Sequence, residues 1–454
     1  MTRHDLFDQP VSLTDAAAVR EWNAMISAFL AHGAMTPVHL GKLLEIAPDF
    51  AAAHAVKGLF YALLGRREVM HEAQIALACA EALESGANAR ERSLIVALRH
   101  FLEGDPSVAI TAIEATLATA PTDTLAMKLS HALRFVIGDG PGMRQSVEKV
   151  LPTYDDDHPG RGYLLGCHAF ALEETGDYAR AALTGRAALT LAPDDAWGLH
   201  AVTHVYDMTA DARGGLDWLE GREAAWIHCN NFGFHVWWHK ALMLLDLGRM
   251  DEALDLYDTR IRSEKTDDYR DISNATSLLS RLELEGVDVG RRWEELADLS
   301  EKRTEDGCLI FADLHYLLAL TNDGREGATA RMMARLAADA ARSGTEIERL
   351  MAVPGLNAAR GLEAFGDGDY GTAFAALARA RPHMQGAGGS HAQRDVFERL
   401  TIDAGLRAGQ LTEAQAILAD RTARRGGYED AYAAARRDLI ARAENVSCPK
   451  GASA

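Results

Sequence analysis

The sequence lacks the features that mark secreted, membrane-spanning and nucleic-acid-binding proteins. Its five cysteines are odd in number and show no C-x-x-C spacing, which indicates a reduced, cytoplasmic protein. No apolar run is long enough to span a bilayer, and the N-terminus lacks the apolar core of a signal peptide. The chain contains 47 Lys and Arg against 66 Asp and Glu. The resulting net charge of -19 argues against a nucleic-acid partner and against an anionic membrane surface.

Alternating strand patterns are nearly absent too, whereas breaks between amphipathic runs recur about every 38 residues from Gly65 to Gly409. The breaks lie at Gly33, Gly65, Gly104, Gly138, Gly176, near Asp211, and at Gly248, Gly286, Gly324, Gly366 and Gly409. Units of this length, each made of two helices and a Gly-containing turn, are typical of a helical solenoid. We expect an all-α, right-handed superhelix of about ten to eleven helix hairpins.

The clearest unit runs from Arg161 to Asp195. Its Gly176-Asp177-Tyr178 turn is followed by small alanines that let two helices approach closely, and Pro193 opens the next helix. The pattern resembles the tetratricopeptide repeat (TPR). We expect one TPR-like solenoid over residues 1–444 and a flexible C-terminal tail over 445–454.

Two H-x-x-x-H pairs, His200/His204 and His235/His239, recur one unit apart. Residues four apart share a helix face, so each pair aims two imidazoles in one direction. Both pairs lie at nearly the same distance before the turn of their unit, in the first helix, which lines the concave surface of such repeats. The spacing predicts that the four imidazoles line one cavity.

Aromatic residues gather in the same region, since five of the seven tryptophans lie between Trp197 and Trp238. Tryptophans in helical repeats usually wedge between helices. Trp238, next to His239, is the one we expect in the wall of a ligand pocket.

Two further segments carry unusual polar residues. Asp271 opens a run of small polar residues on the first helix of its unit, where such residues need partners. Gly388-Gly389-Ser390 opens a helix with Ser390 as its N-cap and with His391 and Asp395 on one face. We expect His391 and Asp395 to reach the same cavity, because units four to five repeats apart begin to face each other across a superhelix. A capped helix with a surface His/Asp pair is the alternative.

The segments from His200 to Met208, which includes Tyr206, from His235 to Leu242, from Asp271 to Leu282 and from Ser390 to Asp395 resemble, in order, the motifs of the tetratricopeptide repeat protein 38 family. The resemblance covers nearly the whole chain. It implies a superhelical TPR-like fold and a cytosolic protein, and it implies no reaction.

The sequence favours an enzyme that acts on a small polar metabolite by acid/base chemistry, either hydrolysis or proton transfer. The predicted catalytic residues are His200, His204, His235, His239, His391 and Asp395, and the predicted substrate-binding residues are Trp238, Asp271, Arg394 and Tyr206. The four clustered histidines also suit Zn, Mn or Fe, although the H-E-x-x-H signature is absent. Metal-free chemistry stays equally open, with Cys167 and Cys229 as remote nucleophile candidates.

The alternative function is a scaffold without chemistry that binds a peptide or a small ligand in its concave groove. The sequence leaves a homo-oligomer open.

Overall fold

The computed structural model describes residues 3–447 as an array of antiparallel helix pairs, and their number agrees with the predicted ten to eleven hairpins. The first half contains α1 (Ala16–Leu30), α2 (Thr36–Ile46), α3 (Ala51–Ala62), α4 (Arg67–Ala82), α5 (Ala89–Leu102), α6 (Pro106–Thr119), α7 (Thr124–Val136), α8 (Gly140–Val150), α9 (Arg161–Glu174), α10 (Tyr178–Leu191), α11 (Ala196–Met208) and α12 (Ala212–Leu219). The second half contains α13 (Phe232–Asp246), α14 (Met250–Leu256), α15 (Tyr269–Leu284), α16 (Arg292–Glu301), α17 (Ile310–Asn322), α18 (Glu326–Ala341), α19 (Glu346–Leu350), α20 (Leu356–Gly366), α21 (Tyr370–Ala380), α22 (His391–Arg407), α23 (Leu411–Arg424) and α24 (Ala431–Ser447).

Shorter elements fill the connections. They are η1 (Glu84–Gly86), η2 (Leu151–Thr153), η3 (Glu223–Ala225), η4 (Tyr257–Ile261), η5 (Met351–Gly355) and η6 (Arg381–Ala387). Near the N-terminus, β1 (Arg3–His4) pairs antiparallel with β2 (Pro10–Val11). The predicted C-terminal tail begins inside α24, and its part from 448 to 454 lies outside the described residues. Within 3–447, no helix combines the length and apolar character needed to cross a membrane.

The turns inside the hairpins depend on the left-handed backbone conformation. Glycines with positive φ hold most of them, as the spacing predicts: Gly65, Gly104, Gly138, Gly176, Gly248, Gly286, Gly324, Gly368 and Gly409. Gly368 replaces the predicted Gly366, which is the last residue of α20. Ala210 (φ 55°) takes this conformation next to the predicted break at Asp211, and His32 (φ 57°) takes it one residue before the predicted Gly33.

The array winds back upon itself, so that its second half contacts its first. The backbone N–H of Ala34 donates to His228 O (3.0 Å), that of Ile347 donates to Gly104 O (3.2 Å), and that of His391 donates to the Glu174 carboxylate (2.8 Å). These contacts join residues 194, 243 and 217 positions apart. One superhelical turn therefore takes between five and six hairpins, and the turns inside the first hairpins meet the starts of helices in the second half.

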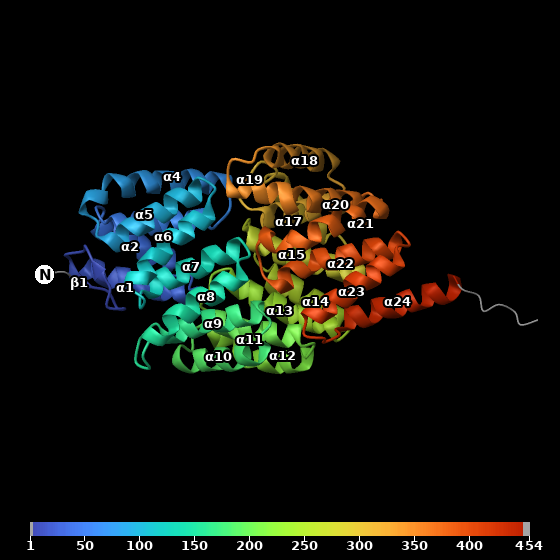
Figure 1. Ribbon diagram of the computed structural model, residues 1–454, viewed down its shortest axis with the longest axis horizontal. Coiled ribbons are helices and arrows are strands. Elements are labelled where there is room, and N and C mark those ends of the chain that lie inside the picture. Colours follow the sequence, from blue (N-terminus) through green and yellow to red (C-terminus); the bar gives the residue numbers. More distant parts are fainter. Residues whose placement is uncertain (1–2, 448–454) are drawn as a thin grey trace, which may run out of the picture.

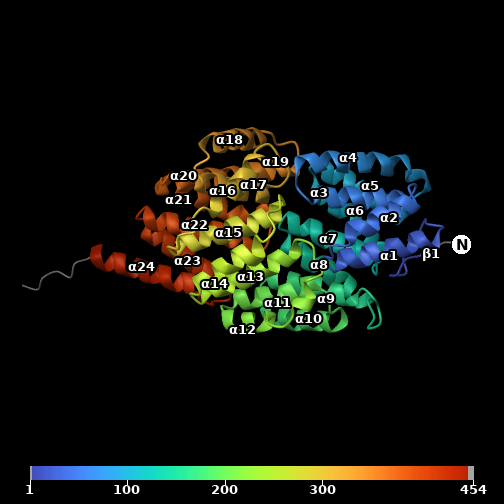
Figure 2. The ribbon, with the colours of Figure 1, turned by 180° about the vertical axis from the view of Figure 1, so that it is seen from behind.

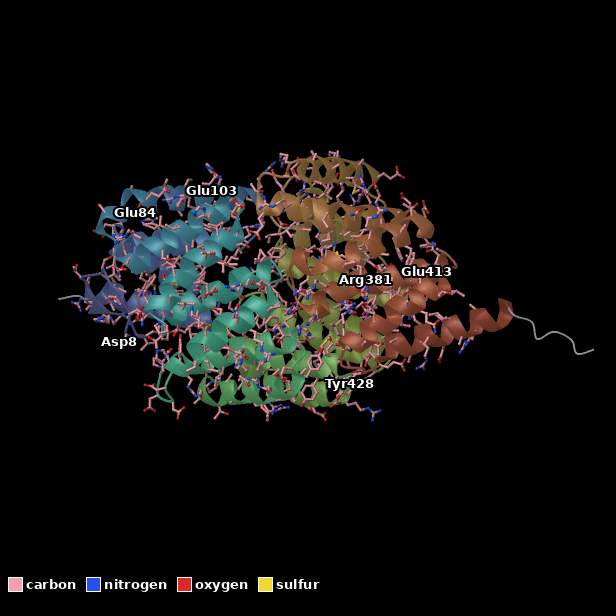
Figure 3. All side chains as sticks on the ribbon, in the orientation of Figure 1. Asp8, Glu84, Glu103, Arg381, Glu413 and Tyr428 are labelled. Carbon is pink, nitrogen blue, oxygen red and sulfur yellow. The ribbon has the colours of Figure 1, made fainter. Side chains whose placement is uncertain are left out.

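Figure 1 shows this arrangement. The helices from α1 to α6 lie at one end of the molecule, and α24 projects at the other end. The short α19 lies against α6 at the junction between the two halves. The view from behind keeps α11 and α13 side by side near the middle (Figure 2), where both are packed against further helices. Exposed carboxylates such as Glu103 and Glu413 lie at the rim (Figure 3).

Candidate functional site

The four histidines of α11 and α13 meet at one point. The Nε2 atom of His200 lies 3.0 Å from Nε2 of His235, 3.0 Å from Nε2 of His239 and 2.9 Å from Nε2 of His204. The Nε2 atoms of His235 and His239 are 3.2 Å apart. All four side chains are buried, with His235 the most exposed at 9%. The i, i+4 spacing on two neighbouring helices thus turns four ring nitrogens of the same kind toward one centre.

Two neighbouring helices hold the outer nitrogens of two of these rings. Nδ1 of His235 lies 2.9 Å from Oδ1 of Asn274 on α15. Nδ1 of His204 lies 3.3 Å from a carboxylate oxygen of Glu173 on α9, and both residues are fully buried. Because an amide oxygen only accepts hydrogen bonds, Nδ1 carries the proton in His235 and its Nε2 presents a lone pair to the centre. The nearby Glu173 carboxylate favours a proton on Nδ1 of His204 in the same way.

Burial decides the charge of most of the cluster. It lowers the pKa of His235 to about 3 and holds the pKa values of His200 and His239 well below the ordinary value. Burial also acts to lower the pKa of His204, but the Glu173 carboxylate outweighs it and raises that pKa. Three imidazoles are therefore neutral at pH 7, and the positive charge that Glu173 favours lies on the His204 side.

Aromatic rings enclose the cluster. Trp238 is fully buried and stacks on His235 with ring centroids 5.2 Å apart, while Phe170 stacks on His200 at 5.6 Å. Trp197 and Phe232 pack on His200 from the other side. These rings shield most of the cluster from solvent.

A cavity of about 700 Å³ adjoins the cluster, with His200 and His235 in its wall. Most of its lining is apolar and comes from α2, α3, α7 and α17, as in Leu40, Phe60, Phe135 and Phe311. The N-terminal hairpins and the returning second half of the chain together enclose it. The volume falls in the range of ordinary small-molecule pockets.

Sequence reasoning missed three residues that the fold brings to this cavity. His32 lies in the α1–α2 turn and stacks between Trp197 and Phe232, with centroids 5.3 and 4.5 Å away. The Lys128 amine lies 5.0 Å from the Trp197 ring centre in a side chain only 3% exposed. Asn231 directly precedes α13, and its side-chain amide donates to the Asp271 carboxylate (2.7 Å). No sequence signal pointed to His32, because Gly33 stands beside it as the expected break of the first hairpin.

His391 and Arg394 lie near the cluster but outside the cavity. Nε2 of His391 is 2.9 Å from the backbone oxygen of Glu174, and Arg394 lies 3.3 Å from the Glu174 carboxylate. Glu174 follows Glu173, the partner of His204. The second half of the chain thus reaches the outer side of the cluster through α9 rather than contributing a fifth inward imidazole.

Asp395 has a different place from the predicted one. Its carboxylate accepts from Arg421 (2.6 Å) and Arg399 (2.7 Å) and lies 3.8 Å from Arg281. Burial would raise its pKa, but Arg421 and Arg399 hold that pKa well below the ordinary range. We expected Asp395 to orient His391. In the structure its carboxylate lies among three arginines instead.

Two predicted substrate contacts lie elsewhere. Tyr206 packs on the outer helices, where its hydroxyl accepts from Arg186 (2.8 Å). Asp271 is fully buried, and burial raises its pKa to about 6. It touches the cavity only through Asn231, which is a lining residue.

The candidate nucleophiles are inert thiols. Burial raises the pKa of Cys167 to about 11 and that of Cys229 to about 12. Few molecules would carry a thiolate at pH 7, so neither cysteine fits the predicted nucleophilic role.

The chain is an all-α, TPR-like superhelical protein. No family model matches it. Solved structures align with low similarity: the human IFIT1 dimer with PPP-AAAA has 14% identity and a TM-score of 0.40, covering 87% of this chain and 95% of that one. The IFIT1 dimer with m7Gppp-AAAA has 14% identity and a TM-score of 0.41 over 87% and 90%. The TPR domain of P58(IPK) has 17% identity and a TM-score of 0.21 over 76% and 88%.

The predictions about partners need correction. The exclusion of nucleic acids does not stand, because it rests on the net charge alone. The IFIT1 structures that align with this chain contain PPP-AAAA and m7Gppp-AAAA. Net charge is a property of the whole surface, and a chain of charge -19 still places Lys57 and Lys128 in the wall of its cavity. The expected small polar metabolite does not suit a cavity whose lining is mostly apolar.

Proposed function

We propose that the protein is a TPR-like scaffold that binds a small, mostly apolar molecule with one anionic group inside its superhelix. The observation that carries this proposal is the concave, mostly apolar cavity of about 700 Å³ with a buried amine in its wall. A flat groove would suit an extended peptide, whereas a concave apolar space with few polar groups suits a small ligand.

Lys128 supplies the preference for an anion. Among the described residues Lys128 forms no salt bridge with a carboxylate, and its amine donates to the Cys167 sulfur at 3.9 Å. A buried ammonium without a partner is costly, and an anionic ligand would relieve that cost. Asp195 offsets this charge only in part, since burial raises the pKa of Asp195 to about 7 even with Lys128 opposing the rise.

The test compares decanoate with decanol, which has the same chain length and no charge. We expect the purified protein to bind decanoate more tightly in calorimetric titrations. Lys128→Met should weaken decanoate binding about 10- to 100-fold, because one charge-assisted contact contributes about 1.5–3 kcal/mol. Decanol binding should change little.

Lys240→Met is the matched control, because Lys240 lies over Trp237 outside the cavity. It should leave both titrations unchanged. Equal affinity for decanoate and decanol in the unaltered protein, or equal losses for both after Lys128→Met, would contradict the proposal.

A second candidate is an enzyme on the same ligand, favoured by the presence of His200 and His235 in the cavity wall. Neutral imidazoles of low basicity serve better as ligands or electrophiles than as general bases. Loss of turnover in His200→Gln, with decanoate binding retained, would support this second candidate.

The motifs around His200, His235, Asp271 and Ser390 also support membership of the tetratricopeptide repeat protein 38 family as part of this proposal. The cytoplasmic location predicted from the cysteines belongs here as well.

A further inference from the structure

We infer that His200, His204, His235 and His239 form a binding site for one divalent transition-metal ion, with zinc as the simplest occupant. The inference rests on the convergence of four Nε2 atoms. Too few hydrogens are available to form a hydrogen bond in every contact between them. It is independent of the ligand proposed for the cavity.

The distances suit tetrahedral coordination. At a zinc–nitrogen distance of about 2.0–2.1 Å, the four nitrogens of a tetrahedral site lie roughly 3.3 Å apart. The Nε2 atoms in contact here are 2.9 to 3.2 Å apart. An outward shift of a few tenths of an ångström per ring would open the site fully.

Hydrogen bonds alone cannot satisfy these nitrogens. His204 and His235 carry their protons on Nδ1, so only His200 and His239 can place a hydrogen at the centre. At most two hydrogens are then available for four close contacts. A second proton on His204 would give three, and the contacts of His200 with His204 and His239 would then set N–H groups against each other. A cation at the centre accepts a lone pair from every ring.

The surroundings match those of metal-binding histidines. The carboxylate of Glu173 at His204 and the amide oxygen of Asn274 at His235 hold the rings as outer partners of a metal site usually do. Both carboxylate oxygens of Glu173 are buried, and the contact of this carboxylate with Nδ1 of His204 (3.3 Å) does not satisfy it fully. A buried anion of this kind requires a positive charge nearby, which a metal ion supplies through the His204 ring.

The test is metal analysis of the full chain, produced without a histidine tag and dialysed against a chelator and then against Zn²⁺. We expect about one zinc per chain by mass spectrometry of the elements. Reconstitution with Co²⁺ should produce the visible absorption of a tetrahedral nitrogen site. Zinc should also raise the melting temperature, because it binds only the folded chain.

His239→Ala should lose the bound zinc, whereas His315→Ala should keep it. His315 is the matched control, because it is a fully buried histidine of α17 whose Nδ1 lies 2.8 Å from the Phe311 backbone oxygen. If His239→Ala fails to fold, His239→Gln and chelator competition on the unaltered protein replace it. A folded, dialysed protein that takes up far less than one zinc per chain would overturn the inference, as would equal zinc in the two variants.

Glu173 would be a positioning residue in this site. Glu173→Gln keeps the shape but removes the charge at His204, and we expect it to weaken zinc about 10- to 100-fold in chelator competition. A purely structural role would alter the melting temperature of the zinc-free protein and leave zinc affinity unchanged.

Discussion

At the scale of single residues, the same side-chain type has quite different surroundings along this chain. His200 faces three other imidazoles, His315 is satisfied by a backbone oxygen, and His391 lies at the outer side of α9. Asp395 shows the same dependence on context, because its pairing with arginines makes it a structural anion. Spacing within one helix identifies residues that share a face but not what lies opposite that face.

Asp395→Asn should therefore cost stability rather than a specific catalytic step. Breaking a buried ion pair costs about 3–5 kcal/mol and would leave Arg421 poorly compensated. The lowered pKa means that the stabilisation is present above the unfolded pKa, about 3.9, and is lost as the pH falls below it. Urea unfolding should show a large difference from the unaltered protein at pH 7 and a smaller one at pH 3. An equal difference at both values would contradict this account.

At the scale of elements, capping decides how α22 meets the first half of the chain. Ser390 accepts from the Gln393 backbone N–H, and the Gln393 side chain accepts from the Ser390 N–H in return. The capped helix end presents the His391 N–H to the Glu174 carboxylate. A carboxylate at a helix N-terminus is favourable, so α22 docks on α9 by its end.

Ser390→Ala should destabilise the protein by about 1 kcal/mol through loss of the cap. Hydrogen exchange should rise at the start of α22 and also at the α9–α10 turn that contacts it. Asp369→Ala is the comparison, because Asp369 caps α21 at an exposed site. It should raise exchange in α21 alone. Unchanged exchange at the α9–α10 turn after Ser390→Ala would show that the two elements are not coupled.

At the scale of the whole molecule, the stacking of the second half on the first encloses the cavity. Gly138 lies at one of these contacts, with a φ of +69°. A Cβ atom there would lie 1.8 Å from the backbone oxygen of Gln385. The close approach of the two halves therefore requires glycine at this turn.

Gly138→Ala should separate the halves locally and weaken ligand binding in the cavity. Gly176→Ala is a matched control, since Gly176 also has a positive φ but a Cβ there would meet nothing within 4 Å. The control should lose about 1–2 kcal/mol from backbone strain alone. Gly138→Ala should lose clearly more in urea unfolding and bind decanoate less well. Equal losses in the two variants would remove the packing argument.

The sequence by itself determined the all-α class, the repeat length and the two histidine pairs, because glycine spacing and i, i+4 spacing are local properties of a helical chain. Only the tertiary structure decided that Glu173 and Asn274 hold the outer nitrogens, that Lys128 and His32 reach the cavity, and that Asp395 turns to arginines. These partners lie on other hairpins, some of them a full superhelical turn away. Their positions depend on how the hairpins stack. The stacking is the sum of the small rotations between successive repeats.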